Sequence, residues 1–435
     1  MASFSIPLTG LESDSTALNT IANDISNMNT TAFKAQTTNF SDLFYQEIGS
    51  TGSGDPIQVG AGVKVASNET SFTQGSINST GNATDVALDG NGFFAIGNGS
   101  GGFELTRDGS FTQAANGNLL SNGMSVMGYP AVNGVVNTNA PLTAINIPIG
   151  AVQESKATTT MSMTANLDSA TTAGTQFPAQ LTLYDSLGDP HLVTVTYTPT
   201  ANANIWDYSA SLPAGDYSTT LPNVVPAAIT GTMQFDSGGN LTTVTPTGQP
   251  AETVGTAGGD VQSIGLNFNP AATNVLADGA AGLNIQWNLL GASGKPTISQ
   301  VDTSSAVSAT SQDGYASGQY QSFAIGSDGT VTITYSNGQK ENVGQLALGN
   351  VANLQGLELM GDGNYTTTLV SGAASFGASG TAGMATLQDN SLEASNVNIS
   401  TEFSNLIIAQ RAFEANAKSV TTFDTVTQDT INMVH

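Results

Sequence analysis

Residues 11–28, LESDSTALNTIANDISNM, carry an aliphatic residue at every seventh position: Leu11, Leu18 and Ile25. A seven-residue repeat places these side chains in one narrow stripe along a helix. Such a stripe suits contact with another helix better than docking on a broad globular core. The stretch therefore predicts an amphipathic helix from about Ser5 to about Met28 that packs against further helices.

The other end of the chain predicts a matching helix, from about Leu392 to about Asn432, with a break near Asn398. The expected cap is Ser391, or Ser395 or Ser400 if the helix starts after that break. Two interpretations stay open: the two ends pair in an ordinary monomer, or their stripes contact further copies in a polymer. The predicted assembly interface consists of Leu11, Leu18, Ile21, Ile25, Ile399, Phe403, Leu406, Phe413, Ala417 and Val420.

The composition excludes several classes of function. Only 9% of the 435 residues are charged, and 33 acidic residues face 8 basic ones, which gives a net charge of −25. The basic residues are scattered, so we expect no nucleic-acid binding and no attraction to anionic membranes. The chain has no cysteine, which excludes disulfides and thiolate metal sites. No basic residue precedes Lys34 and no apolar run approaches the length of a membrane span, so we predict neither membrane insertion nor a cleaved secretory signal.

Short strands with turn residues between them fill the middle of the chain. The turn Asp89-Gly90-Asn91-Gly92 predicts a hairpin, as do Asp185–Asp189 and Asn337-Gly338-Gln339. Trp206 and Trp287 are the expected core anchors of the central β block. The first and third blocks share a turn style and the second is interposed, which predicts nested domains.

The predicted fold class is α+β and mainly β, with coiled-coil-like N- and C-terminal helices that pair and with nested inner and outer β domains. The predicted segments are an N-terminal assembly helix (1–34), a linker region (35–71), the first part of an inner β domain (72–150), an inserted outer β domain (151–305), the second part of the inner domain (306–384) and a C-terminal assembly helix (385–435).

Three patterns could suggest chemistry, and we discount each of them. The Asp/Asn/Gly turns lack the alternating acids and final Glu of an EF-hand loop. His191 lies near Asp185, Ser186 and Asp189, but no nucleophile elbow accompanies them. The glycines at 97, 99 and 101 precede no helix that could hold a phosphate. We therefore predict no catalytic residues, no cofactor, no metal site and no enzymatic activity.

Several motifs resemble those of the flagellar axial protein family, which comprises the rod, hook and hook-associated proteins of bacteria. The N-terminal motif is 18–34, LNTIANDISNMNTTAFK, in which Ala32 stands where the family usually has Gly. The C-terminal motifs are 392–397, LEASNV, and 409–417, AQRAFEANA. DGNGFF (89–94) and TRDGSF (106–111) are similar to the family's shared β domain. The central insert, with LYDSLG (183–188) and FDSGGNL (235–241), resembles the outer domain of hook proteins and is absent from the much shorter rod proteins.

The resemblance implies a structural subunit of the hook, a curved and flexible tube that transmits torque from the motor rod to the filament. It implies a helical homopolymer, with the rod, the hook cap, the hook–filament junction proteins and the type III export apparatus as partners. The implied location is the extracellular flagellum. Two alternatives stay open: a distal-rod protein of the same family, and a secreted β-rich adhesin or binding module.

Overall fold

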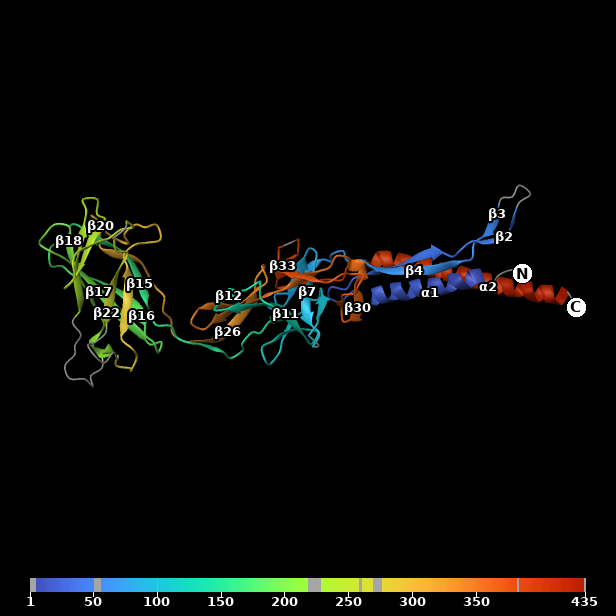
Figure 1. Cartoon of the computed structure of the whole chain (residues 1–435), viewed down its shortest axis with the longest axis horizontal. Coiled ribbons are helices and arrows are strands. Elements are labelled where there is room, and N and C mark those ends of the chain that lie inside the picture. The colour runs from blue at the N-terminus through green and yellow to red at the C-terminus, as the bar shows by residue number, and fades with distance from the viewer. Residues whose placement is uncertain are drawn as a thin grey trace. The chain divides into compact units, whose positions relative to one another are not determined.

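The computed structural model describes residues 5–50, 56–99, 101–217, 228–257, 260–268, 276–381 and 383–433, and the chain forms two compact units (Figure 1). Unit 1 comprises Met1–Ile149, Gln321–Thr334 and Lys340–His435, and unit 2 comprises Gly150–Tyr320 and Tyr335–Gln339. The fold is mainly β with one long helix at each end, which confirms the predicted fold class. Neither helix, over the residues described, is long and apolar enough to cross a membrane.

In the described residues, unit 1 contains both α-helices, one large sheet and four two-stranded sheets. Its elements are α1 (Ser5–Ser26), β1 (Gln36–Asp42), β2 (Gln46–Ser50), β3 (Pro56–Val59), β4 (Val63–Thr70), β5 (Ile77–Ser79), β6 (Val86–Asp89), β7 (Phe93–Gly97), β8 (Phe103–Thr106), β9 (Thr112–Gln113), β10 (Leu119–Ser121), β11 (Met124–Val132), β12 (Val135–Val136), β13 (Thr143–Ala144), β27 (Thr330–Tyr335), β28 (Lys340–Leu346), β29 (Leu348–Asn350), η2 (Leu354–Gly356), β30 (Glu358–Gly361), β31 (Asn364–Thr366), β32 (Ser375–Gly377), β33 (Thr386–Asp389), β34 (Ser391–Glu393) and α2 (Ile399–Met433).

Unit 2 is built from strands and one short 3-10 helix, and β26 (Gly318–Ile325) continues from unit 2 into unit 1. Its other elements are β14 (Val152–Gln153), β15 (Thr160–Asp168), β16 (Phe177–Tyr184), β17 (Pro190–Pro199), β18 (Ile205–Ser211), η1 (Ala214–Asp216), β19 (Ile229–Phe235), β20 (Leu241–Pro246), β21 (Glu252–Thr253), β22 (Ser263–Phe268), β23 (Leu283–Asn288), β24 (Ile298–Val301) and β25 (Ala306–Gln312).

The main sheet of unit 1 follows the order β27-β28-β11-β7-β8-β31-β30, so strands from both halves of the chain interleave. The predicted hairpin across Asn337-Gly338-Gln339 is confirmed, because β27 and β28 pair antiparallel. The predicted hairpin at 89–92 is wrong. β6 pairs with β33 and β7 pairs with β8. The carbonyls of Gly90 and Gly92, in the connection between β6 and β7, accept hydrogen bonds from the Arg107 guanidinium instead.

Strands occupy most of the segment for which the sequence predicts a linker. β1 pairs antiparallel with β4, and β2 pairs with β3. β1 and β4 pack along α1 (Figure 1). No pattern in the sequence indicates this contact with the helix. The tip of the predicted loop, residues 51–55, lies outside the described residues.

The last helix begins later than the sequence predicts. Ser391–Glu393 is a strand that pairs with β5, and α2 starts at Ile399. Its N-cap is Asn398, whose Oδ1 accepts hydrogen bonds from the backbone N–H groups of Ser400 (3.0 Å) and Thr401 (3.2 Å). The predicted break near Asn398 is thus the helix start. Residues 391–393 stay extended because the Glu393 side chain is bound by groups from the first part of the chain.

Unit 2 packs two sheets around one apolar core. One sheet runs β16-β17-β18-β19-β20-β21, and the other runs β22-β23-β15-β24 with β25 also paired to β15. The predicted hairpin across Asp185–Asp189 is confirmed by the β16–β17 pairing. Trp206 and Trp287 are buried in this core as predicted. The predicted outer domain stops at 305, whereas unit 2 continues to Tyr320, because β25 pairs along the length of β15.

Candidate functional site

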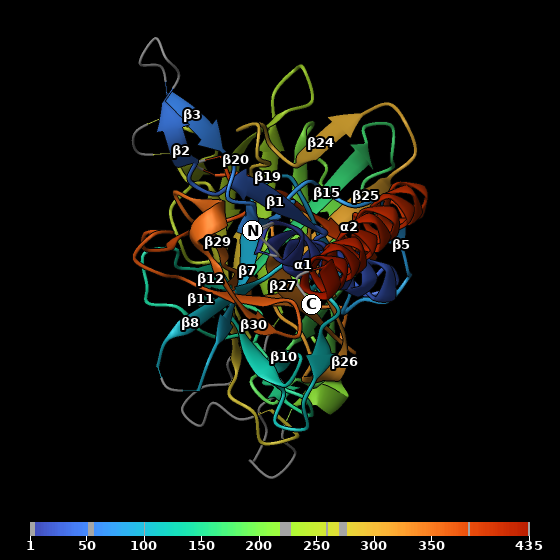
Figure 2. The same ribbon diagram turned by 90° about the vertical axis from the view of Figure 1, so that its right-hand side faces the viewer.

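The two terminal helices lie side by side and pack through small and polar residues (Figures 1 and 2). On α1 the buried residues are Pro7, Gly10, Ser13, Ala17, Thr20 and Asp24, and on α2 the buried residue is Ala409. A Cβ on Gly10 would lie 2.6 Å from Nδ2 of Asn416, so glycine is what allows the helices to approach there. Asn416 also donates a hydrogen bond to Asp14 at 2.9 Å.

None of the apolar residues that the sequence predicts as the interface is fully buried in the single chain. Leu11, Leu18, Ile21, Ile25, Leu406, Ala417 and Val420 are half-buried. Three others are exposed, with 42% of Ile399, 51% of Phe403 and 37% of Phe413 accessible. Of the ten predicted residues, these three are therefore the ones that the helix pair of a single chain leaves exposed.

Sequence reasoning missed a second set of exposed apolar side chains on the same helices. They do not follow the seven-residue repeat, so the stripe did not include them. Further exposed apolar residues on strands β1 and β3 and on the chain between β1 and β2 add to this surface. The additional residues are Ile6, Leu8, Ile407, Ile408, Val426, Met433, Phe40, Phe44, Tyr45, Ile57 and Val59.

A groove of about 300 Å³ lies between α1, α2 and β1. Ala17 and Ile21 of α1, Phe40 of β1, and Ile408 and Ala412 of α2 line it. Polar residues, among them Asp14 and Glu402, line the rest of this groove, so its surface is mixed. An apolar side chain of another molecule could enter it without displacing the helix contact.

Asp24 is a buried acid at the end of the helix pair. Its Oδ2 accepts a hydrogen bond from the backbone N–H of Gln36 at 2.9 Å, while its Oδ1 has no hydrogen-bond partner among the described residues. Burial raises the pKa of Asp24 to about 6, against the lowering effect of the Gln36 N–H, and the charge of Glu402 adds to the rise. The helix contact therefore contains a carboxyl group that is easier to bury when protonated.

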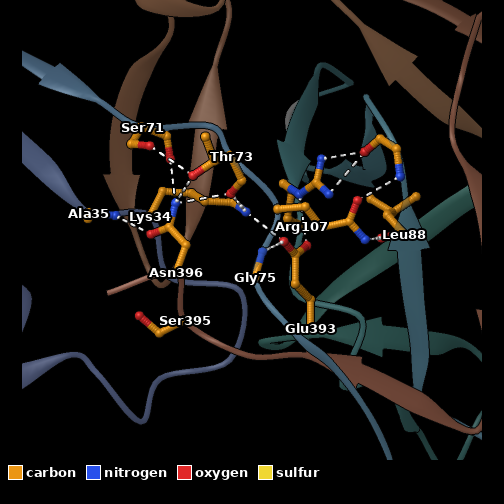
Figure 3. Close-up of polar contacts among 12 residues, drawn as sticks. Lys34, Ala35, Ser71, Thr73, Gly75, Leu88, Arg107, Glu393, Ser395 and Asn396 are labelled. Carbon is orange, nitrogen blue, oxygen red and sulfur yellow. Dashed lines mark hydrogen bonds and ion pairs between the residues drawn. The ribbon is translucent and has the colours of Figure 1, made fainter. Parts of the chain in front are cut away.

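Glu393 joins the beginning, the middle and the end of unit 1 (Figure 3). Its Oε1 accepts hydrogen bonds from Lys34 Nζ at 2.6 Å and from the Gly75 backbone N–H at 2.8 Å. Its Oε2 accepts one from Arg107 Nε at 2.9 Å. The side chains of Lys34 and Glu393 are fully buried and that of Arg107 is 4% exposed. Burial lowers the pKa of Lys34, and the hydrogen bond to Glu393 opposes that effect.

Asn396 fixes the chain three residues later. Its Oδ1 accepts from the backbone N–H of Ala35 at 2.8 Å, and its Nδ2 donates to the carbonyls of Ser71 at 2.8 Å and Thr73 at 3.0 Å (Figure 3). Gly75 is required beside it, because a Cβ there would overlap the Ala394 carbonyl oxygen. The segment that leads into α2 is thereby attached to the segment that leaves α1.

Sequence reasoning did not identify this polar network. Lys34 and Glu393 are separated by more than 300 residues, so no local pattern connects them. A usable signal existed, however: two of only 8 basic residues in the chain lie within the motifs 18–34 and 106–111. Basic residues that are rare overall and fall inside motifs are candidates for buried ion pairs.

Comparisons with known proteins agree with this architecture. Residues 87–163 match the flagellar hook protein FlgE/F/G D1 domain, 152–315 match the flagellar basal body protein FlaE D2 domain, and 388–433 match the flagellar basal body rod FlgEFG protein C-terminal region. The flagellar hook protein FlgE of Treponema pallidum is 33% identical, over 98% of each chain. The flagellar hook proteins FlgE of Borreliella burgdorferi and Escherichia coli are each 32% identical, over 98% and 99% of each chain.

Among solved structures, the Helicobacter pylori flagellar hook protein FlgE2 aligns with a TM-score of 0.52 at 14% identity. The alignment covers 73% of this chain and 100% of that one, and at this identity it supports the fold alone. The family assignment rests on the sequence relatives, because their alignments cover nearly the whole chain, including the central insert. This chain belongs to the bacterial flagellar hook protein family.

Proposed function

We propose that this chain polymerises through α1 and α2 into the tube of the bacterial flagellar hook. The chain is a structural subunit of the hook, as its family membership indicates. The observation that carries the polymer contact is the set of exposed apolar side chains on the terminal helices, which a single chain leaves uncovered. Many exposed large apolar side chains on two packed helices are typical of a surface that a partner covers.

The residues proposed to make the contact between subunits are the ten predicted from the sequence together with their exposed neighbours Ile407 and Ile408. Burying one such side chain stabilises an assembly by about 1.5–3 kcal/mol. A helical polymer repeats that contribution at every subunit. A few exposed residues on each helix are therefore enough to drive assembly of a chain whose net charge is −25.

The finer parts of the proposal concern mechanics and partners. The tube bends and transmits torque from rod to filament, while the β units form contacts that slide between subunits. A surface with 9% charged residues has few strong ion pairs to break during sliding. The rod, the hook cap, the hook–filament junction proteins and the type III export apparatus are the proposed partners, and export needs no cleaved signal. None of this work requires catalysis.

Substitution of Phe413 tests the polymer contact. Phe413→Asp places a carboxylate on the apolar surface of α2, where desolvation in the assembly costs several kcal/mol. We expect it to abolish polymers, as judged by sedimentation. Phe413→Leu is the matched control, because it keeps an apolar side chain at the same position and should still assemble.

The folded state of the monomer must be checked in the same experiment. Thermal circular dichroism of the β-strands should be the same for both variants and the parent protein. Tubes formed by Phe413→Asp would remove α2 from the interface. An early loss of β-structure in that variant would instead assign Phe413 to the internal packing of the monomer.

A further inference from the structure

Unit 2 contains a histidine surrounded by three carboxylates. His191 of β17 has its Nδ1 2.9 Å from Asp216 Oδ2, and its Nε2 3.1 Å from Asp185 Oδ2 and 3.6 Å from Asp278 Oδ2. The His191 and Asp185 side chains are 7% and 0% exposed, whereas those of Asp216 and Asp278 are 25% and 23% exposed. One edge of the cluster is thus open to solvent.

The backbone holds two of these carboxylates in place. Asp185 Oδ1 accepts hydrogen bonds from the N–H groups of Leu187 (2.8 Å), Gly188 (2.7 Å) and Asp189 (2.9 Å). Asp278 Oδ1 accepts one from the Ala280 N–H at 2.8 Å. In both residues one oxygen is bound by main chain and the other faces the imidazole. The arrangement is therefore fixed before any ligand arrives.

The carboxylate oxygens around His191 outnumber the hydrogen-bond donors of a neutral imidazole. A neutral imidazole has one N–H donor and one lone pair, yet both ring nitrogens of His191 face carboxylate oxygens. If Nδ1–H donates to Asp216, the lone pair of Nε2 faces the oxygens of Asp185 and Asp278. A proton on Nε2, a proton on the Asp278 carboxyl, or a metal ion between the three atoms would relieve that repulsion.

The carboxylates around His191 favour its protonated form. Burial alone lowers the pKa of His191, but the hydrogen bonds and charges of Asp216 and Asp185 outweigh it, and the net shift is upward. The pKa of Asp278 is raised by burial and by the neighbouring Asp185. A divalent ion at this point would contact the Nε2 lone pair and both carboxylate oxygens, and it would have to displace the proton from His191.

We propose that Asp185, His191 and Asp278 form a zinc site in the outer unit, with Asp216 as the residue that orients the imidazole. The three ligand atoms lie within 4.8 Å of one another. Tetrahedral ligands of zinc, at their usual bond lengths, are about 3.3–3.6 Å apart, close to the observed separations from Nε2. The nitrogen ligand selects zinc over Mg²⁺ and Ca²⁺, which prefer oxygen. Asp216 on Nδ1 is the carboxylate–histidine–metal arrangement common to zinc sites.

The site would tie together three separate parts of unit 2. Asp185 lies in the turn between β16 and β17, and Asp216 ends η1. Asp278 lies in the segment before β23. Zinc binding would therefore stabilise this unit specifically. Both tryptophans of the chain lie in the same unit, so their fluorescence reports on it alone.

The experiment uses the full-length protein after treatment with a chelator and measures zinc binding by calorimetry. We expect one equivalent of zinc to bind at micromolar concentration near pH 7.5 and to raise the midpoint of thermal unfolding followed by tryptophan fluorescence. Mg²⁺ at the same concentration should do neither. Near pH 5.5 binding should weaken by about tenfold or more, because protons and zinc compete for the same ligands.

Variants separate this site from other carboxylates and from the second histidine. Asp278→Asn, which removes a partly exposed ligand, should abolish the calorimetric signal, and Asp216→Asn should weaken binding by about 10–100-fold. Asp236→Asn is the matched control, since Asp236 accepts backbone hydrogen bonds in a similar exposed turn. That control and His435→Asn should bind zinc as the parent does. No binding, binding unaffected by Asp278→Asn, or binding lost with His435→Asn would overturn the proposal.

Discussion

Glu393 is the residue through which distant parts of unit 1 are connected. The carboxylate of Glu393 is buried and accepts hydrogen bonds from two buried cations and one backbone N–H. Water cannot reach it to replace a lost partner. Removing one member of a buried ion group leaves the others uncompensated, which costs about 3–5 kcal/mol. Glu393 is also the last residue of strand β34, and the segment that leads into α2 follows it.

Glu393→Gln should therefore destabilise unit 1 by about 3–5 kcal/mol, because it keeps the shape of the side chain but removes its charge. Urea unfolding followed by far-ultraviolet circular dichroism should show an earlier transition. Tryptophan fluorescence should be unchanged, since both tryptophans lie in unit 2. Glu358→Gln, at an exposed position on β30, is the control and should have little effect. Equal stability of the two variants would show that the network is dispensable.

The helix pair depends on contacts of a different kind, because its buried residues are mostly small and polar. Helices held by few apolar contacts are marginal in water, so α1 and α2 should be only partly formed in dilute monomer. Asp24 adds a pH dependence to this equilibrium. Its pKa is about 6 in the folded state and 3.8 ordinarily, so the folded state binds the proton more tightly. The helix contact is therefore more stable below about pH 4 and loses that stability as pH rises through about 6.

The expected result is a higher helix content of dilute monomer near pH 5 than near pH 7.5, measured by circular dichroism at low concentration. Asp24→Asn should raise the helix content at the higher pH and remove the dependence, because the amide oxygen can still accept from Gln36 without a charge. Glu12→Gln, an exposed change on α1, is the matched control. A pH dependence that persists in Asp24→Asn would assign the effect to another group.

Elements formed by neighbouring residues could be predicted from the sequence, and elements formed by distant ones could not. The repeat of Leu11, Leu18 and Ile25 predicted α1, and the turn at 185–189 predicted the β16–β17 hairpin. An equally good turn signal at 89–92 follows β6, yet the partner of β6 is β33, about 300 residues later. In the same way, nothing local predicts that Asp216 and Asp278 join His191.

At the scale of the whole molecule, we propose that the outer unit folds by itself. Unit 2 has its own core around Trp206 and Trp287, and its two sheets are complete without unit 1 strands. A fragment of residues 150–320 should unfold in one cooperative thermal transition. A fragment of residues 150–305 lacks β25 and should melt at a lower temperature, because β15 loses its antiparallel partner. Equal melting of the two fragments, or a broad transition in both, would contradict this division.

The central claim is that the chain assembles into the curved tube of the hook through its terminal helices. The most direct measurement is electron microscopy of polymers grown from the purified full-length protein. The account predicts curved tubes in which α1 and α2 form the contacts between subunits and cover Phe403, Ile408 and Phe413. Straight tubes would indicate the distal-rod alternative. Tubes in which these three side chains remain exposed to solvent would contradict the account.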